Sequence, residues 1–139
     1  MGSIQSINPA TGQAPIGPYS PAVVAGGFVF VSGQIPRDES GRMVAESIEA
    51  ATRQSLANLK SILAAAGCVP PDVVKTTVFM QDLSDFEGMN KTYAEFFGEH
   101  RPARSTVQAA RLPGNARVEI ECIALKRQQY NSAIPVEIS

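Results

Sequence analysis

The chain has 139 residues, of which 18% are charged, and its formal net charge is −1. This length fits one domain with a core of its own, and the balanced charge lacks the basic face or stripe of most nucleic-acid binders. No apolar run approaches the roughly 18 residues that cross a bilayer, so we expect neither a membrane protein nor a nucleic-acid-binding protein.

The first third of the chain predicts a β-hairpin. Residues 16–21 are rich in Pro, Gly and Ser and are expected to be irregular. Two apolar runs, 22–25 and 28–32, flank Gly26-Gly27, and a glycine pair between such runs is typical of a tight hairpin turn. The second strand is expected to end within Ser32–Pro36, before a polar loop.

A long amphipathic helix follows the hairpin. From about Ser47 to Ala66, apolar residues recur at spacings of three and four. Gly67 occupies the position of a left-handed C-terminal cap, and Pro70-Pro71 are expected to prevent the helix from restarting.

A strand and a second helix come next. Residues 73–81 are rich in Val, Thr and Phe and predict a strand. Ser84 or Asp85 can cap a helix that closes at Gly98. One stripe of this helix is expected to contain Phe86, Met89, Asn90, Tyr93, Phe96 and Phe97.

Two final strands, at about 103–109 and 117–126, flank the loop 112–115. The predicted order is therefore β-β-α-β-α-β-β. This is an α+β layout, in which two helices cover one face of a mixed sheet.

The other face of this sheet should be polar in a monomer, and the sequence predicts that it is not. Neither side of the 28–32 strand is hydrophilic, and Ile123 and Leu125 add apolar surface on the last strand. An apolar sheet face without cover implies burial against another subunit, so we expect an obligate homo-oligomer.

Charged residues on the last two strands are the first candidates for a functional site. Alternation places Glu119 and Glu121 on one face of their strand, together with aliphatic side chains. A carboxylate there needs a partner, because an unpaired ion is costly to remove from water. Arg104 could be that partner in a structural salt bridge. Alternatively, its planar guanidinium could hold the carboxylate of a substrate through two parallel hydrogen bonds.

Single residues elsewhere have equally open interpretations. A partly desolvated Glu119 would have a raised pKa and could orient or activate water, whereas at a solvated strand edge it would have no such role. Its spacing from Glu121 does not decide which of the two is functional. Tyr19 and Ser32 could each offer a hydroxyl to a substrate, or could satisfy the local backbone as turn serines usually do.

Several catalytic and cofactor patterns are missing from the sequence. His100 is the only histidine, which argues against a His-based metal site and a Ser–His triad. Cys68 and Cys122 do not form a C-x-x-C pair, so neither a disulfide framework nor a zinc knuckle is expected. There is no glycine-rich nucleotide-binding loop. The first residues lack the layout of a signal peptide, so we expect a cytoplasmic protein.

Five co-linear segments together resemble the RidA/YjgF family of proteins. They are residues 16–21, 32–36, 74–79, 102–107 and 118–121. The resemblance runs from about Ile16 to Arg127, so one family domain is expected within residues 1–127, with 128–139 as a C-terminal extension. It implies a chorismate-mutase-like α+β fold that forms a homotrimer around a central barrel, with an active site at each subunit interface.

The activity implied by the resemblance is hydrolysis of reactive enamines and imines, such as 2-aminoacrylate/2-iminopropanoate and 2-iminobutanoate, to 2-keto acids and ammonia. No metal or organic cofactor is implied. By position, Arg104 would clamp the substrate carboxylate and Glu119 would hold the attacking water. The pocket would be lined by Tyr19, Ser32, the Gly33 backbone, Asn90 and Thr106.

One residue departs from the family pattern. Many deaminating members have a cysteine at the position of Thr106, which keeps a small polar side chain but lacks the thiol.

Three other functions stay open. They are an endoribonuclease and translation inhibitor, a pathway-specific deaminase such as one for 2-aminomuconate, and a non-catalytic binder of small metabolites.

Overall fold

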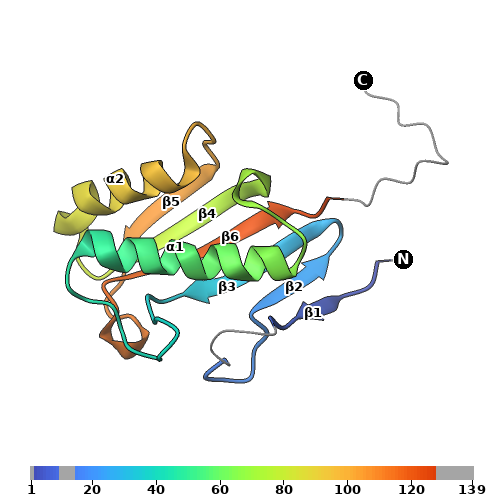
Figure 1. Cartoon of the computed structure of the whole chain (residues 1–139), viewed down its shortest axis with the longest axis horizontal. Helices are drawn as coiled ribbons and strands as arrows, with labels where there is room; N and C mark the ends of the chain where they lie inside the picture. The colour runs from blue at the N-terminus through green and yellow to red at the C-terminus, as the bar shows by residue number, and fades with distance from the viewer. Residues whose placement is uncertain (1, 10–14, 128–139) are drawn as a thin grey trace.

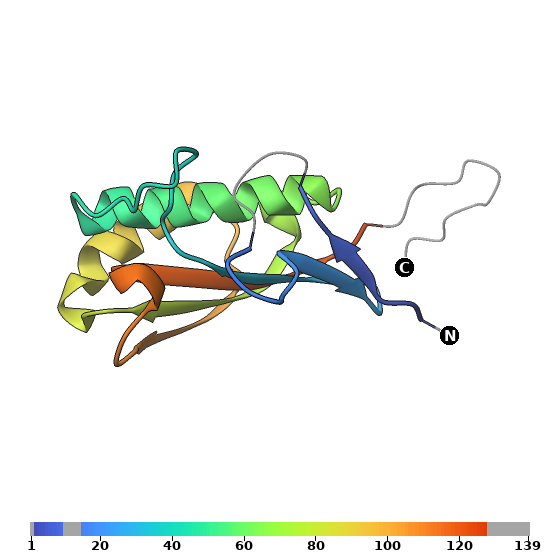
Figure 2. The same ribbon diagram turned by 90° about the horizontal axis from the view of Figure 1, so that it is seen from below.

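The structure is a computed structural model that describes residues 2–9 and 15–127. Two helices lie on one face of a six-stranded sheet (Figures 1 and 2). The expected C-terminal extension, 128–139, lies outside the described residues. In chain order the elements are β1 (Gln5–Ile7), β2 (Ala22–Ala25), β3 (Phe28–Gln34), α1 (Ile48–Ala65), β4 (Val73–Met80), α2 (Phe86–Phe97), β5 (Ala103–Gln108) and β6 (Val118–Leu125).

The strands are ordered β1-β2-β3-β6-β4-β5 across the sheet. The last strand, β6, lies between β3 and β4 and is antiparallel to both. At the sheet edge, β5 pairs with β4 in parallel, and α2 supplies the crossover that a parallel pair needs. The predicted α+β layout is confirmed. The sequence pattern did not indicate β1, because its three largely exposed residues form a strand only by pairing with β2.

The predicted hairpin is confirmed and is closed by its two glycines. Gly26 and Gly27 have φ angles of 58° and 82°, values at which a Cβ atom would be strained. The turn places Ala25 opposite Phe28. β3 then continues to Gln34, which lies within the predicted range Ser32–Pro36 for its end.

Both ends of α1 agree with the prediction. The Ser47 hydroxyl accepts a hydrogen bond from the backbone N–H of Ala50 at 3.0 Å, and such a cap satisfies an otherwise unpaired donor. Gly67 closes the helix in the left-handed region, with φ of 77°. A single 3-10 turn, Pro70–Asp72, follows before β4.

The predicted cap of α2 is confirmed in its position but not in its hydrogen bond. Asp85 occupies the capping position, but its side chain makes no capping hydrogen bond. Its carboxylate instead pairs with Arg117, at 3.0 Å from Nη2. The preceding turn is capped by Asp82, which accepts from the Ser84 N–H at 2.9 Å. Competition from this cationic partner, on the segment before β6, explains why the Asp85 side chain does not make the capping hydrogen bond.

The stripe of α2 is also rotated from the predicted one. Its buried residues are Met89, Thr92, Tyr93 and Phe97, whereas Asn90 is exposed and Phe86 is 38% exposed. Phe86 and Asn90 therefore lie on a flank of the helix rather than against the core. This flank borders the candidate functional site.

The two faces of the sheet differ sharply. Alternate residues of β6 are buried beneath the helices, where they join a core that includes Leu56, Leu59 and Leu63 of α1. No described helix covers the opposite face, called here the open face (Figure 2). It exposes Phe28, Phe30, Val107 and Leu125, each by 39–49%. The apolar open face predicted from sequence is therefore present. Neither α1 nor α2 is long and apolar enough to cross a membrane.

Candidate functional site

Arg104 lies on the helix-facing side of the edge strand β5. It is the parallel partner of Thr76, whose hydroxyl bonds to the Tyr93 hydroxyl of α2 at 2.7 Å. The guanidinium carbon lies 4.7 Å from the centroid of the Tyr93 ring and 5.5 Å from that of Phe86. These distances are within the range of cation–π contacts, so two aromatic rings surround the arginine.

The arginine does not pair with either strand glutamate. Glu119 is the β6 partner of Phe79, which lies three residues beyond Thr76 on β4 and therefore on the opposite face. Within the described residues Arg104 has no ion pair, and the basic partners of the recorded pairs are Arg42, Arg117 and Arg127. A structural salt bridge within one chain, the first of the two interpretations, is excluded.

Two further predicted residues gather around Arg104. Thr106 follows it by two positions, so both side chains share the helix-facing side of β5. On α2, Asn90 is four residues from Phe86 and three from Tyr93, so it shares the flank that carries both rings. Arg104, Thr106, Asn90 and the two rings are called here the arginine cluster.

A second group of predicted residues is linked to Glu119, on the open side of the sheet, through Gly33 of β3. Its carboxylate lies over Gly33, so closely that a Cβ atom on Gly33 would be 2.5 Å from Oε1. Ser32 donates its hydroxyl to the carbonyl of Ser20 at 2.7 Å and thereby ties the loop of Tyr19 to β3. Tyr19 itself is 52% exposed. Glu119, Gly33, Ser32 and Tyr19 are called here the glutamate cluster.

The environment of Glu119 disfavours its charged form. Burial raises the pKa of this carboxyl above its ordinary value, and the negative charge of Glu121 adds to the rise. No described residue donates a hydrogen bond to the Glu119 carboxylate. Such a group can hold and activate a water molecule more readily than an exposed one.

The free thiols do not take part in either cluster. Cys122 faces the core, and burial raises the pKa of its thiol to about 12. Burial also raises the pKa of Cys68, which lies near the end of α1. Among the described residues, no three His, Cys, Asp or Glu side chains come together as a group that could hold a metal ion.

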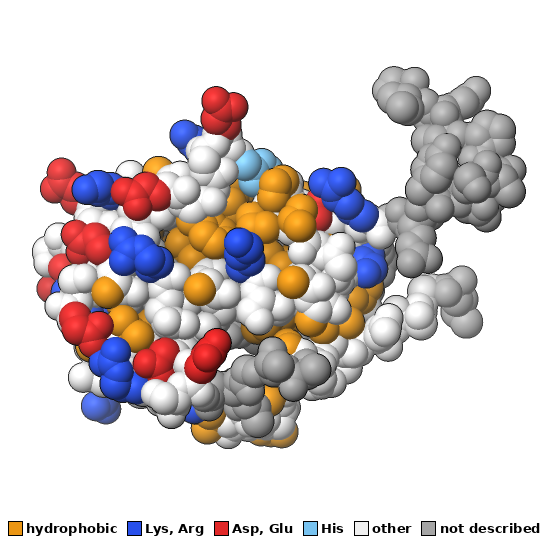
Figure 3. Space-filling view, in the orientation of Figure 1, with side chains coloured by type: hydrophobic (Ala, Val, Ile, Leu, Met, Phe, Trp, Pro, Cys, Tyr) orange, Lys and Arg blue, Asp and Glu red, His pale blue; other side chains and the backbone are white. Residues whose placement is uncertain are grey.

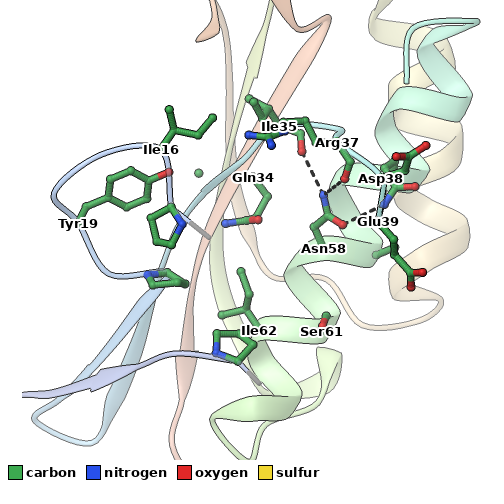
Figure 4. A pocket seen from close by; sticks show the side chains of 16 residues that line it. Ile16, Tyr19, Gln34, Ile35, Arg37, Asp38, Glu39, Asn58, Ser61 and Ile62 are labelled. Carbon is green, nitrogen blue, oxygen red and sulfur yellow. Dashed lines mark hydrogen bonds between the residues drawn. The ribbon is translucent and has the colours of Figure 1, made fainter. Parts of the chain in front are cut away.

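A cavity of about 580 Å³ adjoins the glutamate cluster (Figure 4). Tyr19 and Gly33 line one side, and Gln54, Asn58 and Ser61 of α1 line the other. Asn58 donates to the carbonyls of Ile35 and Arg37 at 3.1 and 3.0 Å and so fixes the loop beside it. The sequence analysis did not predict this wall of the cavity. The spacing of the three α1 residues, four and then three on the polar side of the helix, could have indicated it.

Comparisons with known proteins assign the family. Residues 11–126 match the family model described as Endoribonuclease L-PSP. The chain is 52% identical over 123 residues to 2-iminobutanoate/2-iminopropanoate deaminase of Salmonella typhimurium, a match that covers 85% of this chain and 96% of the relative. The crystal structure of the Escherichia coli YjgF gene product superimposes with a TM-score of 0.83 at 46% identity, covering 88% of this chain and 99% of that one. The chain belongs to the RidA/YjgF family.

Other RidA/YjgF relatives have different names. A RutC family protein of Pyrococcus horikoshii is 52% identical over 113 residues, which are 81% of this chain and 90% of the relative. A solved structure of Escherichia coli TdcF with bound serine has a TM-score of 0.83 at 42% identity, covering 88% of this chain and 99% of that one. The chorismate-mutase-like α+β fold expected from the RidA/YjgF resemblance is confirmed.

Proposed function

We propose that the protein hydrolyses reactive imines and enamines of 2-amino acids, such as 2-iminopropanoate and 2-iminobutanoate, to 2-keto acids and ammonia. The observation that carries this proposal is the state of Arg104. Its guanidinium is half-buried between two rings, has no ion pair among the described residues, and keeps its N–H donors for a planar anion. The names of the Salmonella and Escherichia coli relatives support the same reaction class.

The complete site would be built from two copies of the chain. Arg104 and Glu119 lie on opposite faces of one sheet, so a small substrate could touch both only where two copies meet. The apolar open face gives those copies a reason to associate, because its exposed Phe and Leu side chains would be buried. We propose a homotrimer in which the open faces line a central barrel.

The chemistry needs few protein groups because an imine is already electrophilic. Arg104 would hold the substrate carboxylate, and Glu119 would hold a water molecule against C2. The water oxygen bonds to C2 while a proton reaches the imine nitrogen, giving a carbinolamine. This intermediate then collapses to the C2 carbonyl as the C–N bond breaks and ammonia leaves. An enamine enters the same route after protonation at C3.

The remaining predicted residues would shape this pocket. Asn90 and Thr106 would flank the substrate carboxylate that Arg104 binds. From the other copy, the substrate would be contacted by Tyr19, Ser32 and the Gly33 backbone. Ser32 already donates its hydroxyl to Ser20, so it would accept a hydrogen bond from a ligand rather than donate one. A thiol is not needed for the hydrolysis described, so Thr106 is compatible with activity.

RNA cleavage is a second candidate because the matching family model carries the description Endoribonuclease L-PSP. The charge distribution opposes it. Acidic and basic side chains are interspersed on the face seen in Figure 3, without a continuous basic stripe. RNA binding with a steep salt dependence would support this candidate over the deaminase.

The test is a coupled assay with threonine dehydratase, which releases 2-iminobutanoate. The protein should accelerate 2-ketobutyrate formation above the dehydratase alone. Arg104→Ala should reduce the acceleration of 2-ketobutyrate formation by at least about thirtyfold, since removing one member of a close charge pair costs about 2–5 kcal/mol. Arg53→Ala, on the exposed side of α1, is the matched control and should behave as wild type. No acceleration by the wild-type protein would refute the proposal.

A further inference from the structure

We propose that Tyr93 is a positioning residue for Arg104: its ring, tied to β4 by Thr76, sets the plane in which the guanidinium grips a carboxylate. The inference rests on the proposed role of Arg104 and extends it to residues that are not expected to touch the substrate.

The contacts of Tyr93 fix its ring from several sides. The side chain is 7% exposed, and its hydroxyl is 2.7 Å from Oγ1 of Thr76, which is fully buried. Behind it, the Phe97 ring lies 4.8 Å away between centroids. Thr76 and Arg104 are also register partners on β4 and β5. The three residues therefore form a closed arrangement in which β4 holds the ring and the ring faces the arginine.

The type of contact suits a residue that must bind an anion. A carboxylate partner would fix the arginine but would neutralise it and occupy the N–H donors that a substrate needs. An aromatic face attracts the cation through its π electrons and leaves the N–H edge free. Phe86, at 5.5 Å, supplies a second and more exposed wall. Restricting a long side chain on an edge strand before binding lowers the entropy lost when the ligand arrives.

The experiment compares Tyr93→Leu with Phe96→Leu. Phe96 is on the same helix and packs against the core and Phe97, but it is not among the rings that face Arg104. Both variants remove an aromatic ring, so Phe96→Leu controls for lost packing. Tyr93→Phe keeps the ring and removes only the bond to Thr76. The readouts are the dissociation constant for 2-ketobutyrate, KM and kcat for the imine, and the NMR signal of the Arg104 Nε–H group, assigned by its loss in Arg104→Lys.

In the wild type we expect an upfield Arg104 Nε–H signal, because the guanidinium lies over the Tyr93 ring. Tyr93→Leu should move this signal toward its free position and weaken 2-ketobutyrate binding about tenfold, with KM raised more than kcat is lowered. Tyr93→Phe should retain the signal and most of the binding, and Phe96→Leu should retain both.

Two results would overturn the inference: an Arg104 signal unmoved in Tyr93→Leu, or equal weakening of binding in Tyr93→Leu and Phe96→Leu. The NMR signal does not depend on catalysis, so it separates failure of this inference from failure of the deaminase proposal. If the wild type hydrolyses no imine but its Arg104 signal shifts as expected, the positioning role stands and the reaction assignment falls.

Discussion

Glu119 and Arg104 show how two charged residues of one sheet are placed in different surroundings. Arg104 is held by aromatic rings on the helix side, whereas Glu119 lies over a glycine on the open side, close to another carboxylate. The rings leave the positive charge available to an anion. The position of Glu119 raises its pKa and makes its proton easier to retain.

This difference predicts a pH effect of Glu121, which is exposed and follows Glu119 by two positions on the same face. If the carboxylate form of Glu119 activates water, activity falls as pH drops through its raised pKa. Glu121→Gln removes a negative charge that raises this pKa, so the pKa should fall and the acidic limb of the kcat/KM profile should move to lower pH. Glu95→Gln, on the exposed side of α2, should leave the profile in place. An unchanged limb in Glu121→Gln would mean that Glu119 is not the titrating group.

At the scale of elements, the meeting of β3 and β6 decides where Glu119 points. The register of this pair shifts between Val31 and Gln34, and Gly33 lies inside the shift. Without a Cβ atom, Gly33 leaves room for the Glu119 carboxylate to approach the β3 backbone closely. The carboxylate position therefore depends on an irregularity of the neighbouring strand.

Gly33→Ala tests this dependence. The new Cβ would be 2.5 Å from Oε1 of Glu119, and the flexible carboxylate can move away at little cost in stability. We expect a melting temperature close to that of the wild type, with kcat reduced by about tenfold or more because the water would be misplaced. Thermal unfolding and the coupled assay check the two parts separately. Full activity in Gly33→Ala would show that the carboxylate position is not critical.

The elements also show how far sequence reasoning reaches. Periodicity and capping predicted the hairpin, both helices and three later strands, because these signals are local: Ser47 and Gly67 bound α1 where expected. Alternation correctly placed Glu119 and Glu121 on one face. Alternation does not predict the register between β4 and β5, and this register places Arg104 on the side of the sheet that faces α2. The Asp85–Arg117 pair and β1 were missed for the same reason, since both depend on partners distant in sequence.

At the scale of the whole molecule, the open face is the surface that the proposed assembly would bury. Phe28 and Phe30 of β3 lie opposite Leu125 and Ile123 of β6, so one continuous apolar area crosses the middle of the sheet. An exposed area of this kind is costly in water and is typical of a subunit interface. Assembly would join the arginine cluster of one copy to the glutamate cluster of another.

Phe30→Asp should disrupt this assembly. A carboxylate in the apolar area would lose its water on association without gaining a partner, so the oligomer should dissociate and activity should fall with it. Light scattering after size-exclusion chromatography measures the mass. Ala94→Asp, on the exposed side of α2, is the control and should keep the wild-type mass and activity. An oligomer that survives Phe30→Asp would mean that the open face is not the interface.

In the proposed trimer each site takes Arg104 from one copy and Glu119 from another, and this sharing can be tested by mixing subunits that carry different substitutions. Arg104→Ala and Glu119→Ala should each be inactive when refolded alone. When they are refolded together in equal amounts, random association gives about a quarter of the sites both intact residues, so about a quarter of the wild-type activity should return. A mixture that remains as inactive as either variant alone, although mass spectrometry shows hybrid oligomers, would mean that Arg104 and Glu119 of one site do not come from different copies.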